Sequence, residues 1–389
     1  MTDSLVTVIH SARLVSAGET VPDAWLRLED DRVVERGIGE TWRDAAGVAS
    51  GDATVTDASG RILVPGFIDL HCHGAGGAAA EDGERAIETM LDVHSSHGTT
   101  RTVCSLVSAP IEVLVPRLET ISRVAARDSR VLGAHLEGPF LDEAFRGAHD
   151  PAVLRAADDT AVEALLAAAD GTLRQVTLAP EHDPGFAATR LLTEAGVAVA
   201  VGHTGADYAT VTAAFDAGAS LLTHAFNGMR GIHHRQPGPV VAAMHASHVT
   251  LELIADGVHV HPDVVRLAFQ GAPGRVALIT DAMAATGALD GEYDLGSLAV
   301  EVRDGVARVA GTDTIAGSTL TQDVALRRAV HDSGIPFEVA VAALTSVPAA
   351  AVGRAGDLGR LEAGYAADAV LLSDDLTVEA VWGGGIRRV

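Results

Sequence analysis

The 389-residue chain contains no lysine: all 28 of its basic residues are arginines, against 52 acidic residues. Without a lysine amine the chain cannot form a Schiff base, which excludes pyridoxal-phosphate and lysine-aldolase chemistry. A carboxylated lysine is likewise excluded as a bridge between two metal ions. The formal net charge of -24 predicts no nucleic-acid partner, because a phosphate backbone requires a basic face.

Cysteines and long apolar runs are also scarce. The two cysteines, Cys72 and Cys104, have no Cys-x-x-Cys partner, and we expect both to be reduced thiols. Residues 1–10 contain Asp3 and no basic start, so no secretory signal is expected. No uncharged apolar stretch reaches the length of about 18 residues that a membrane span needs. Together these features predict a cytoplasmic protein without a membrane segment.

From residue 61 onward, short apolar strands alternate with alanine-rich segments of helix length. Eight such strand–helix units are typical of a (β/α)8 TIM-like barrel of the α/β class. The predicted strands are residues 63–70, 99–106, 131–136, 174–178, 197–201, 221–223, 250–255 and 276–280. Predicted helices include residues 86–94, 111–127, 161–169 and 187–195.

Short β segments lie on both sides of the predicted barrel. They are residues 5–10, 25–28 and 32–36 near the start, and residues 369–372, 378–382 and 386–389 near the end. We expect them to pair in one small β-sandwich domain of residues 1–60 and 355–389. The barrel, residues 61–354, is then inserted between the two parts. A β-hairpin insertion is expected at residues 298–303 and 306–310.

Five of the eight predicted strands end in histidine, glutamate or aspartate. In TIM barrels the catalytic residues lie at the carboxyl ends of the strands. His71 and His73 are two residues apart, so the alternation of a strand places both side chains on one side. The other strand ends supply Glu137, His203, His224 and Asp281. So many ligand-type residues in one register predict a metal site.

The ligand types restrict the identity and number of the metal ions. Histidines with carboxylates suit Zn, Fe, Co, Ni or Mn, whereas Ca and Mg prefer oxygen ligands. Six candidate ligands are too many for one ion with an open position and enough for two. Glu137 is then the natural bridge, because no lysine is available. The remaining ligands divide into His71, His73 and Asp281 for one ion, and His203 and His224 for the other.

This arrangement predicts a hydrolase. A metal ion in an open site acidifies its bound water toward neutral pH and makes it a nucleophile. Asp281 can accept the proton of that water and later deliver it to a leaving group, as in hydrolysis of an amide or ester. His135 shares a strand face with Glu137, and either supports a ligand or fills the core. Cys72 points away from the ligands and is expected to pack.

Several motifs around these residues belong together. They are His71-x-His73, His135-Leu-Glu137-Gly-Pro-Phe, Gly147-Ala-His149, Gly202-His203-Thr204, Thr223-His-Ala-Phe-Asn227-Gly-Met, Asp256-Gly-Val-His259, Thr280-Asp281-Ala and Ile315-Ala-Gly-Ser318. The set resembles N-acetylglucosamine-6-phosphate deacetylases of the amidohydrolase superfamily over nearly the whole chain. The resemblance implies hydrolysis of N-acetyl-D-glucosamine 6-phosphate to D-glucosamine 6-phosphate and acetate in amino-sugar catabolism. It also implies a barrel with a β-domain made from both chain ends.

The resemblance further implies roles for individual residues. Glu137, His203 and His224 correspond to the principal metal site, for which Zn is the first expectation. Asp281 corresponds to the catalytic acid/base, and His259 to the residue that polarises the substrate carbonyl. Substrate contacts are implied for Ala148, His149, Asn227, Gly228 and Ile315. Some members lack the His-x-His ligands and use one metal ion, whereas this chain keeps both, so one or two ions are expected.

Arg235 corresponds to an arginine that reaches the phosphate bound by a neighbouring subunit, which implies a homodimer. A phosphate that approaches so acidic a protein needs a local cationic group, and the guanidinium fork suits it. Two residues depart from the family pattern: Gly228 stands where alanine is usual, and Gln236 where glutamate is usual. These departures concern the positioning of the substrate rather than the reaction.

Two other functions use the same features. Another amidohydrolase could act on an N-acyl amino acid, a cyclic amide or a nucleobase with the same metal ligands. The phosphate contacts expected from His149, Asn227 and Arg235 have no purpose for an uncharged substrate such as a cyclic amide or a nucleobase. A non-catalytic homologue that serves as a binding protein would be expected to lose ligands or the acid/base, and this chain retains them all.

Overall fold

The computed structural model describes residues 5–48 and 50–389. Residues 1–4, which belong to the segment where no secretory signal is expected, lie outside the described residues. Its centre is an eight-stranded parallel sheet. The strands, in spatial order, are β6 (Phe67–Cys72), β9 (Thr99–Val107), β10 (Val131–Glu137), β11 (Leu173–Leu178), β12 (Ala198–Val201), β13 (Leu221–Leu222), β14 (Thr250–Ile254) and β15 (Val276–Ile279). A parallel bridge between Cys72 and Ala282 joins the two outermost strands and nearly closes the sheet. The predicted barrel is confirmed.

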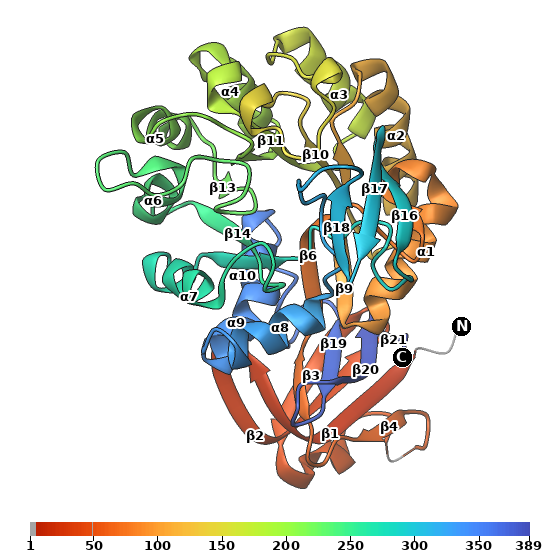
Figure 1. Cartoon of the computed structure of the whole chain (residues 1–389). Coiled ribbons are helices and arrows are strands. Elements are labelled where there is room, and N and C mark those ends of the chain that lie inside the picture. The colour runs from red at the N-terminus through yellow and green to blue at the C-terminus, as the bar shows by residue number, and fades with distance from the viewer. Residues whose placement is uncertain (1–4, 49) are drawn as a thin grey trace.

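Helices surround this barrel on the outside (Figure 1). Within the described residues they are α1 (Glu84–Ser96), α2 (Ile111–Ala125), α3 (Asp159–Ala169), α4 (Ala187–Glu194), α5 (Tyr208–Asp216), α6 (Gly238–His245), α7 (Pro262–Gly271), α8 (Gln322–His331), α9 (Phe337–Leu344) and α10 (Ser346–Ala351). Aspartate side chains cap several of them, for example Asp158 on α3 and Asp207 on α5. None of the described helices is both long and apolar enough to cross a bilayer.

A second sheet combines the two ends of the chain. Its strands are β1 (Val6–Ser16), β2 (Glu19–Glu29), β3 (Arg32–Ile38), β4 (Thr54–Asp57), β5 (Ile62–Pro65), β19 (Ala369–Leu372), β20 (Val378–Gly383) and β21 (Ile386–Arg387). Leu26 of β2 and Trp382 of β20 lie far apart in the strand order but share one apolar cluster, so the sheet curls around its core. Figure 1 shows this unit beside one end of the barrel. The limits of the two domains stay a prediction.

The prediction of one continuous strand over residues 63–70 is wrong. β5 ends at Pro65 and pairs with β1 and β19 in the terminal sheet, whereas β6 begins at Phe67 and joins the barrel. Gly66 stands at the division, where an added Cβ would lie 2.2 Å from Thr100 Oγ1. Only glycine fits this passage between the two sheets. Because both halves are apolar, hydrophobic pattern alone gives no sign of the break.

A buried ion pair joins the barrel to the terminal sheet. Arg101 of β9 donates through Nε to Asp368 Oδ2 at 2.6 Å and through a terminal nitrogen to Oδ1 at 3.0 Å. Both side chains are buried, and the backbone N–H of Gly384 adds a further bond to Asp368 at 2.8 Å. Bidentate geometry of this kind suits an arginine–carboxylate pair enclosed by protein.

The predicted hairpin insertion is a three-stranded antiparallel sheet. Its strands are β16 (Gly291–Leu295), β17 (Leu298–Arg303) and β18 (Val306–Val309), of which β16 was not predicted. A smaller hairpin, β7 (Gly74–Ala75) and β8 (Ala78–Ala79), follows β6. Figure 1 shows the three-stranded sheet in front of the barrel. Its residues form part of the wall of the cavity described next.

Candidate active site

The predicted metal ligands meet at the carboxyl ends of five barrel strands. They are His71 on β6, His73 directly after it, Glu137 at the end of β10, His203 after β12, His224 after β13 and Asp281 after β15. Each is at most 7% exposed. His203, His224 and Asp281 have φ angles of 46°, 25° and 50°, in the left-handed region that non-glycine residues rarely adopt. Such backbone persists only where the surrounding structure holds it, and it concentrates at functional sites.

Glu137 lies between two pairs of histidines. Its Oε2 atom is 3.5 Å from His71 Nε2 and 3.2 Å from His73 Nε2. Its Oε1 atom is 3.0 Å from His203 Nε2 and 2.9 Å from His224 Nε2. The two carboxylate oxygens therefore face two separate ligand groups, which is the placement that the predicted bridge requires.

Both groups have the spacing of metal ligands. In the first, the Nε2 atoms of His71 and His73 are 3.0 Å apart, and Asp281 Oδ1 is 3.3 Å from each. In the second, the Nε2 atoms of His203 and His224 are 3.0 Å apart. Two nitrogens at about 2.0–2.1 Å from a tetrahedral ion are about 3.3 Å apart, so one ion fits each group.

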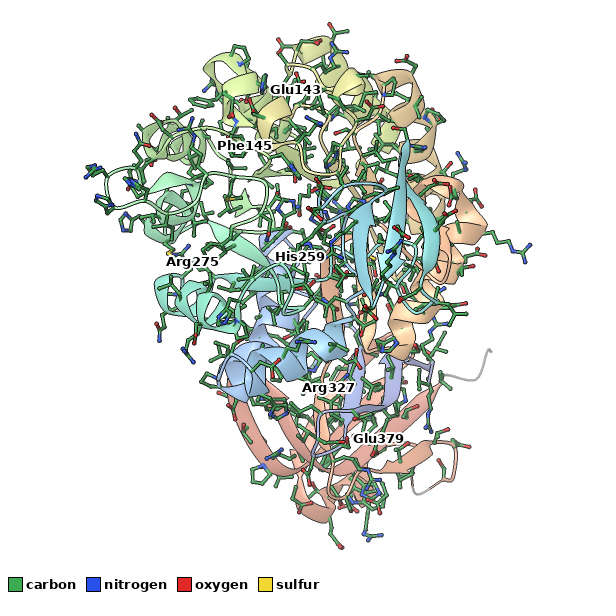
Figure 2. The ribbon with its side chains drawn as sticks, viewed as in Figure 1. Glu143, Phe145, His259, Arg275, Arg327 and Glu379 are labelled. Atoms are coloured by element: carbon green, nitrogen blue, oxygen red, sulfur yellow. The ribbon has the colours of Figure 1, made fainter. Side chains whose placement is uncertain are left out.

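The hydrogen bond of His203 shows which nitrogen is available to a metal ion. Its Nδ1–H donates to the carbonyl oxygen of Phe145 at 2.9 Å, so a neutral ring presents the lone pair of Nε2 to the centre of the group. Phe145 lies in the loop after β10, and Figure 2 labels it. Lone pairs of nitrogen and carboxylate oxygen at such short range repel one another unless a cation lies among them. The second group therefore fits a divalent ion.

The charges of the buried ligands also demand a cation. Burial lowers the pKa of His73, but Asp281 and Glu137 outweigh this effect and raise it to about 9. Burial raises the pKa of Asp281, but His71 and His73 lower it to about 2. The pKa of Glu137 lies well below its ordinary value for the same reason, with His71 as the main opposing charge. Without a metal ion, His71 and His73 are the histidines whose raised pKa values favour the positive charge that the carboxylates require.

A cavity of about 290 Å³ opens above these ligands. Six of the seven predicted substrate-contact residues line it: Ala148, His149, Asn227, Gly228, His259 and Ile315. Arg235 does not line it. Residues 230–236, which include Arg235, are exposed in the loop before α6. Reciprocal backbone hydrogen bonds between His233 and Gln236 hold the tip of this loop as a tight turn.

His259 is held by a carboxylate. Its Nδ1–H donates to Asp256 Oδ2 at 2.6 Å, and Asp256 Oδ1 accepts from the backbone N–H groups of Val258 and His259. Burial lowers the pKa of His259, but Asp256, and to a lesser extent Asp281, raise it above its ordinary value. With Nδ1 occupied, Nε2 is the nitrogen left for a ligand in the cavity. Figure 2 labels His259 beside the β16–β18 insertion.

His149 and Gly228 pack around the second ligand group. Ser108 N–H donates to His149 Nδ1 at 3.3 Å, and His149 Nε2 is 3.4 Å from Glu137 Oε2. Burial lowers the pKa of His149 to about 4, so this ring is neutral and offers a hydrogen bond rather than a charge. Gly228 has a φ of +60°, and an added Cβ would lie 2.9 Å from His203 Nδ1. The alanine that is usual in the family at this position would therefore require the ring of His203 to shift.

His135 and Cys72 are not ligands of either group. His135 is fully buried; its Nδ1 bonds Ser105 Oγ at 2.9 Å and its Nε2 bonds Thr177 Oγ1 at 2.8 Å. Its ring packs edge-on against His71 with centroids 4.5 Å apart, so it supports a ligand from within the core. Cys72 Sγ lies 3.2 Å from His94 Nε2 of α1, which confirms that it points away from the ligands.

Comparison with known proteins agrees with this geometry. Residues 62–386 match the model of the amidohydrolase family. The chain belongs to the amidohydrolase family. It is 35% identical over 379 residues to N-acetylgalactosamine-6-phosphate deacetylase of Escherichia coli O157:H7, covering 96% of this chain and 97% of that protein. It is 37% identical to N-acetylglucosamine-6-phosphate deacetylase of Vibrio furnissii, covering 82% and 81%.

A solved structure of N-acetyl-D-glucosamine-6-phosphate deacetylase from Mycobacterium smegmatis, in complex with N-acetyl-D-glucosamine-6-phosphate, has the same fold. The TM-score is 0.92 at 41% identity, and the match covers 100% of both chains. Membership of the amidohydrolase family implies use of divalent metal ions, and the two ligand groups of this chain could hold them.

Three features of this amidohydrolase site were not assigned from the sequence. Asp256 accepts the hydrogen bond of His259. Its position three residues before that histidine was the feature of the sequence that could have indicated the pair. Leu295 and Asp313 of the insertion line the cavity, but nothing local indicates that a distant hairpin returns there. Glu252 lies on the barrel strand β14 behind His71, and a glutamate within an apolar strand was its signal.

Proposed function

We propose that this amidohydrolase removes the acetyl group of N-acetyl-D-glucosamine 6-phosphate, with D-glucosamine 6-phosphate and acetate as products. The observation that carries the proposal is the position of Glu137 between two ligand groups at the base of a cavity that also contains Asp281 and His259. Relatives over most of the chain are named as deacetylases of this sugar phosphate or of its galactosamine counterpart.

Different residues of the chain have different roles in the reaction. His71, His73, Glu137, His203, His224 and Asp281 would hold one or two divalent ions, with Zn the first expectation and Fe, Co, Mn or Ni as others. A bound ion supplies Lewis-acid activation of water and of the amide carbonyl. Asp281 takes a proton from the attacking water and transfers it to the leaving amine. His259 donates a hydrogen bond to the carbonyl oxygen, where negative charge develops.

The phosphate group requires a cation in addition to His259, which is assigned to the carbonyl oxygen, and the cavity of one chain does not offer an arginine for it. Among the described residues no arginine lines the cavity, and His149 is neutral there. We propose that Arg235 of one chain contacts the phosphate bound in its neighbour, which makes the enzyme a homodimer. The exposure of the loop at residues 230–236 supports this role, because the loop is free to reach outward. A cytoplasmic location fits a phosphorylated substrate and two reduced cysteines.

The same site could act on N-acetyl-D-galactosamine 6-phosphate. The relative from Escherichia coli O157:H7 that carries this name matches 96% of the chain, more than the 82% matched by the Vibrio furnissii protein. The two sugars differ only in the orientation of one hydroxyl group. The ratio of kcat/KM on the two substrates decides which is preferred.

The test is acetate release from both sugar phosphates by purified protein, with metal content measured on the same sample. We expect release that is lost on chelation and restored by Zn, Fe, Co or Mn. Unphosphorylated N-acetyl-D-glucosamine serves as the control and is expected to react poorly. A fully metallated sample that releases no acetate from either phosphate would refute the proposed substrate class.

A further inference from the structure

Glu252 is a buried carboxylate inside the barrel without a role in the mechanism above. It lies on β14 and is 0% exposed. Its Oε1 atom accepts a hydrogen bond from Gln175 Nε2 at 2.7 Å. Its Oε2 atom lies 3.5 Å from His71 Nδ1, on the side of that ring opposite the ligand atom Nε2. Both Oε2 and His71 Nδ1 are without a hydrogen-bond partner among the described residues, since the 3.5 Å between them is longer than a typical hydrogen bond.

An isolated carboxylate at this depth would be very unfavourable. Burial of a charge without a partner costs several kcal/mol, and proteins avoid it by pairing the charge. Within the described residues no arginine bonds to Glu252, Glu137 or Asp281, and the chain has no lysine. The imidazole of His71 is therefore the side chain that links the carboxylate of Glu252 to a positive charge.

The other ligand histidines have different partners. His203 Nδ1 donates to a neutral backbone carbonyl, that of Phe145. His73 Nδ1 and His224 Nδ1 have no hydrogen-bond partner among the described residues. A carboxylate thus stands behind His71 alone, which belongs to the first ligand group with His73 and Asp281. Any effect of Glu252 should be specific to that group.

We infer that Glu252 is a positioning residue for the metal site formed by His71, His73, Glu137 and Asp281. In the metal-loaded site we expect it to accept Nδ1–H of His71, to fix the tautomer that presents Nε2 to the site, and to increase the basicity of the ring. Carboxylates that bind the far nitrogen of a metal-ligand histidine act in this way. Gln175, also 0% exposed, lies on another strand of the barrel and holds the carboxylate in place through its hydrogen bond. The inference rests on the metal site of the proposed function but not on its substrate.

Metal affinity of the Glu252→Gln variant tests this inference, because the amide keeps the size of the side chain and removes its charge. Zn²⁺ or Co²⁺ is titrated into metal-free protein in competition with a chromophoric chelator. We expect two binding events in the unmodified protein. In the variant, one event should weaken by about 10–100-fold, as for other outer partners of ligand histidines, and the other should stay unchanged.

Two further variants make the result specific. Asp183→Asn is the matched control, because Asp183 is also a buried acid but accepts its hydrogen bonds from the backbone of α4 and not from a ligand histidine. It should leave both affinities unchanged. His71→Gln should weaken the same event as Glu252→Gln, and the double variant should lose little more than His71→Gln alone.

Several outcomes would overturn the inference. They are unchanged affinities in Glu252→Gln, equal weakening of both events together with a lower melting temperature, or a single binding event in the unmodified protein. If Glu252→Gln does not fold, Gln175→Ala removes only the brace of the carboxylate and should weaken the same event by a smaller factor. Because the readout is metal affinity, these outcomes are distinct from a failure to release acetate.

Discussion

Replacement of Asp256 by asparagine tests whether His259 acts as a charged hydrogen-bond donor. The asparagine oxygen can still accept from His259 Nδ1, so the orientation of the ring is kept while the negative charge is removed. In the native site burial lowers the pKa of His259, and Asp256 is the main group that raises it again. Without that carboxylate, burial is the largest influence that remains, so the pKa of the ring should fall and the ring should lose its charge at a lower pH than in the native site.

The size of the effect follows from what the variant retains. Complete loss of one donor to a developing oxyanion costs about 10²–10³-fold in kcat. A hydrogen bond from a charged donor is roughly twice as strong as one from a neutral donor, and the neutral ring still donates through Nε2. About half of the free energy should therefore be lost, which corresponds to about 10–30-fold in kcat with little change in KM.

The assay is the pH profile of kcat for acetate release. Because the pKa of His259 is raised in the folded protein, its protonated form and the stability that it contributes are present at low pH. Both are lost as the pH rises through the raised pKa. In Asp256→Asn this loss should occur at lower pH, so activity should recover in part on acidification. Asp263→Asn, beside the exposed His261, is the matched control. An unchanged kcat and pH profile in Asp256→Asn would refute the reasoning.

Three further predictions follow from the site and the domain junction. Asp281→Asn should lower kcat by about 10²–10⁴-fold through loss of the proton carrier, while the metal ion of the group formed by Glu137, His203 and His224 is retained; near-native turnover would remove Asp281 from the mechanism. Arg235→Ala should raise KM for the sugar phosphate but not for the unphosphorylated sugar, and mixing it with Asp281→Asn subunits should restore activity only if the arginine acts across a dimer. Asp368→Asn should leave Arg101 buried and unpaired and destabilise the fold by about 3–5 kcal/mol in denaturant unfolding, whereas a change below 1 kcal/mol would show that the pair is dispensable.

Much of the fold could be predicted because the barrel repeats one pattern. Apolar strands such as β9 and β10 alternate with amphipathic helices such as α1 and α2, and each unit carries its own signal. The terminal sheet was predicted only in outline. β1 and β2 have eleven residues each, but only a short segment of each is predicted from the sequence; the first half of β2 is mostly exposed and carries no apolar alternation. Register shifts within β1 also break the alternation on which such a prediction relies.

The metal ligands could be predicted for a topological reason. Every parallel strand of a barrel ends on the same face, so residues that follow different strands must come together there, as His71, Glu137 and Asp281 do. Arrangements that depend on tertiary contacts could not be predicted in this way. Leu295 and Asp313 reach the cavity through the return of a long insertion. The close approach of Gly228 to the ring of His203 is likewise a tertiary contact, which no local pattern reveals.

The interior of the barrel beneath the ligands combines a ligand that could be predicted with tertiary contacts that could not. Barrel interiors are usually filled by branched apolar side chains. Here His135 forms hydrogen bonds to Ser105 and Thr177, and Glu252 is bound by Gln175. Both chains of polar contacts end at His71, one through its ring face and one through Nδ1. Buried polar groups cost stability unless each finds a partner, so their concentration under one ligand indicates that the orientation of His71 is tightly constrained. A sequence pattern identifies the ligand, but the polar layer that fixes it becomes visible only when the strands are placed side by side.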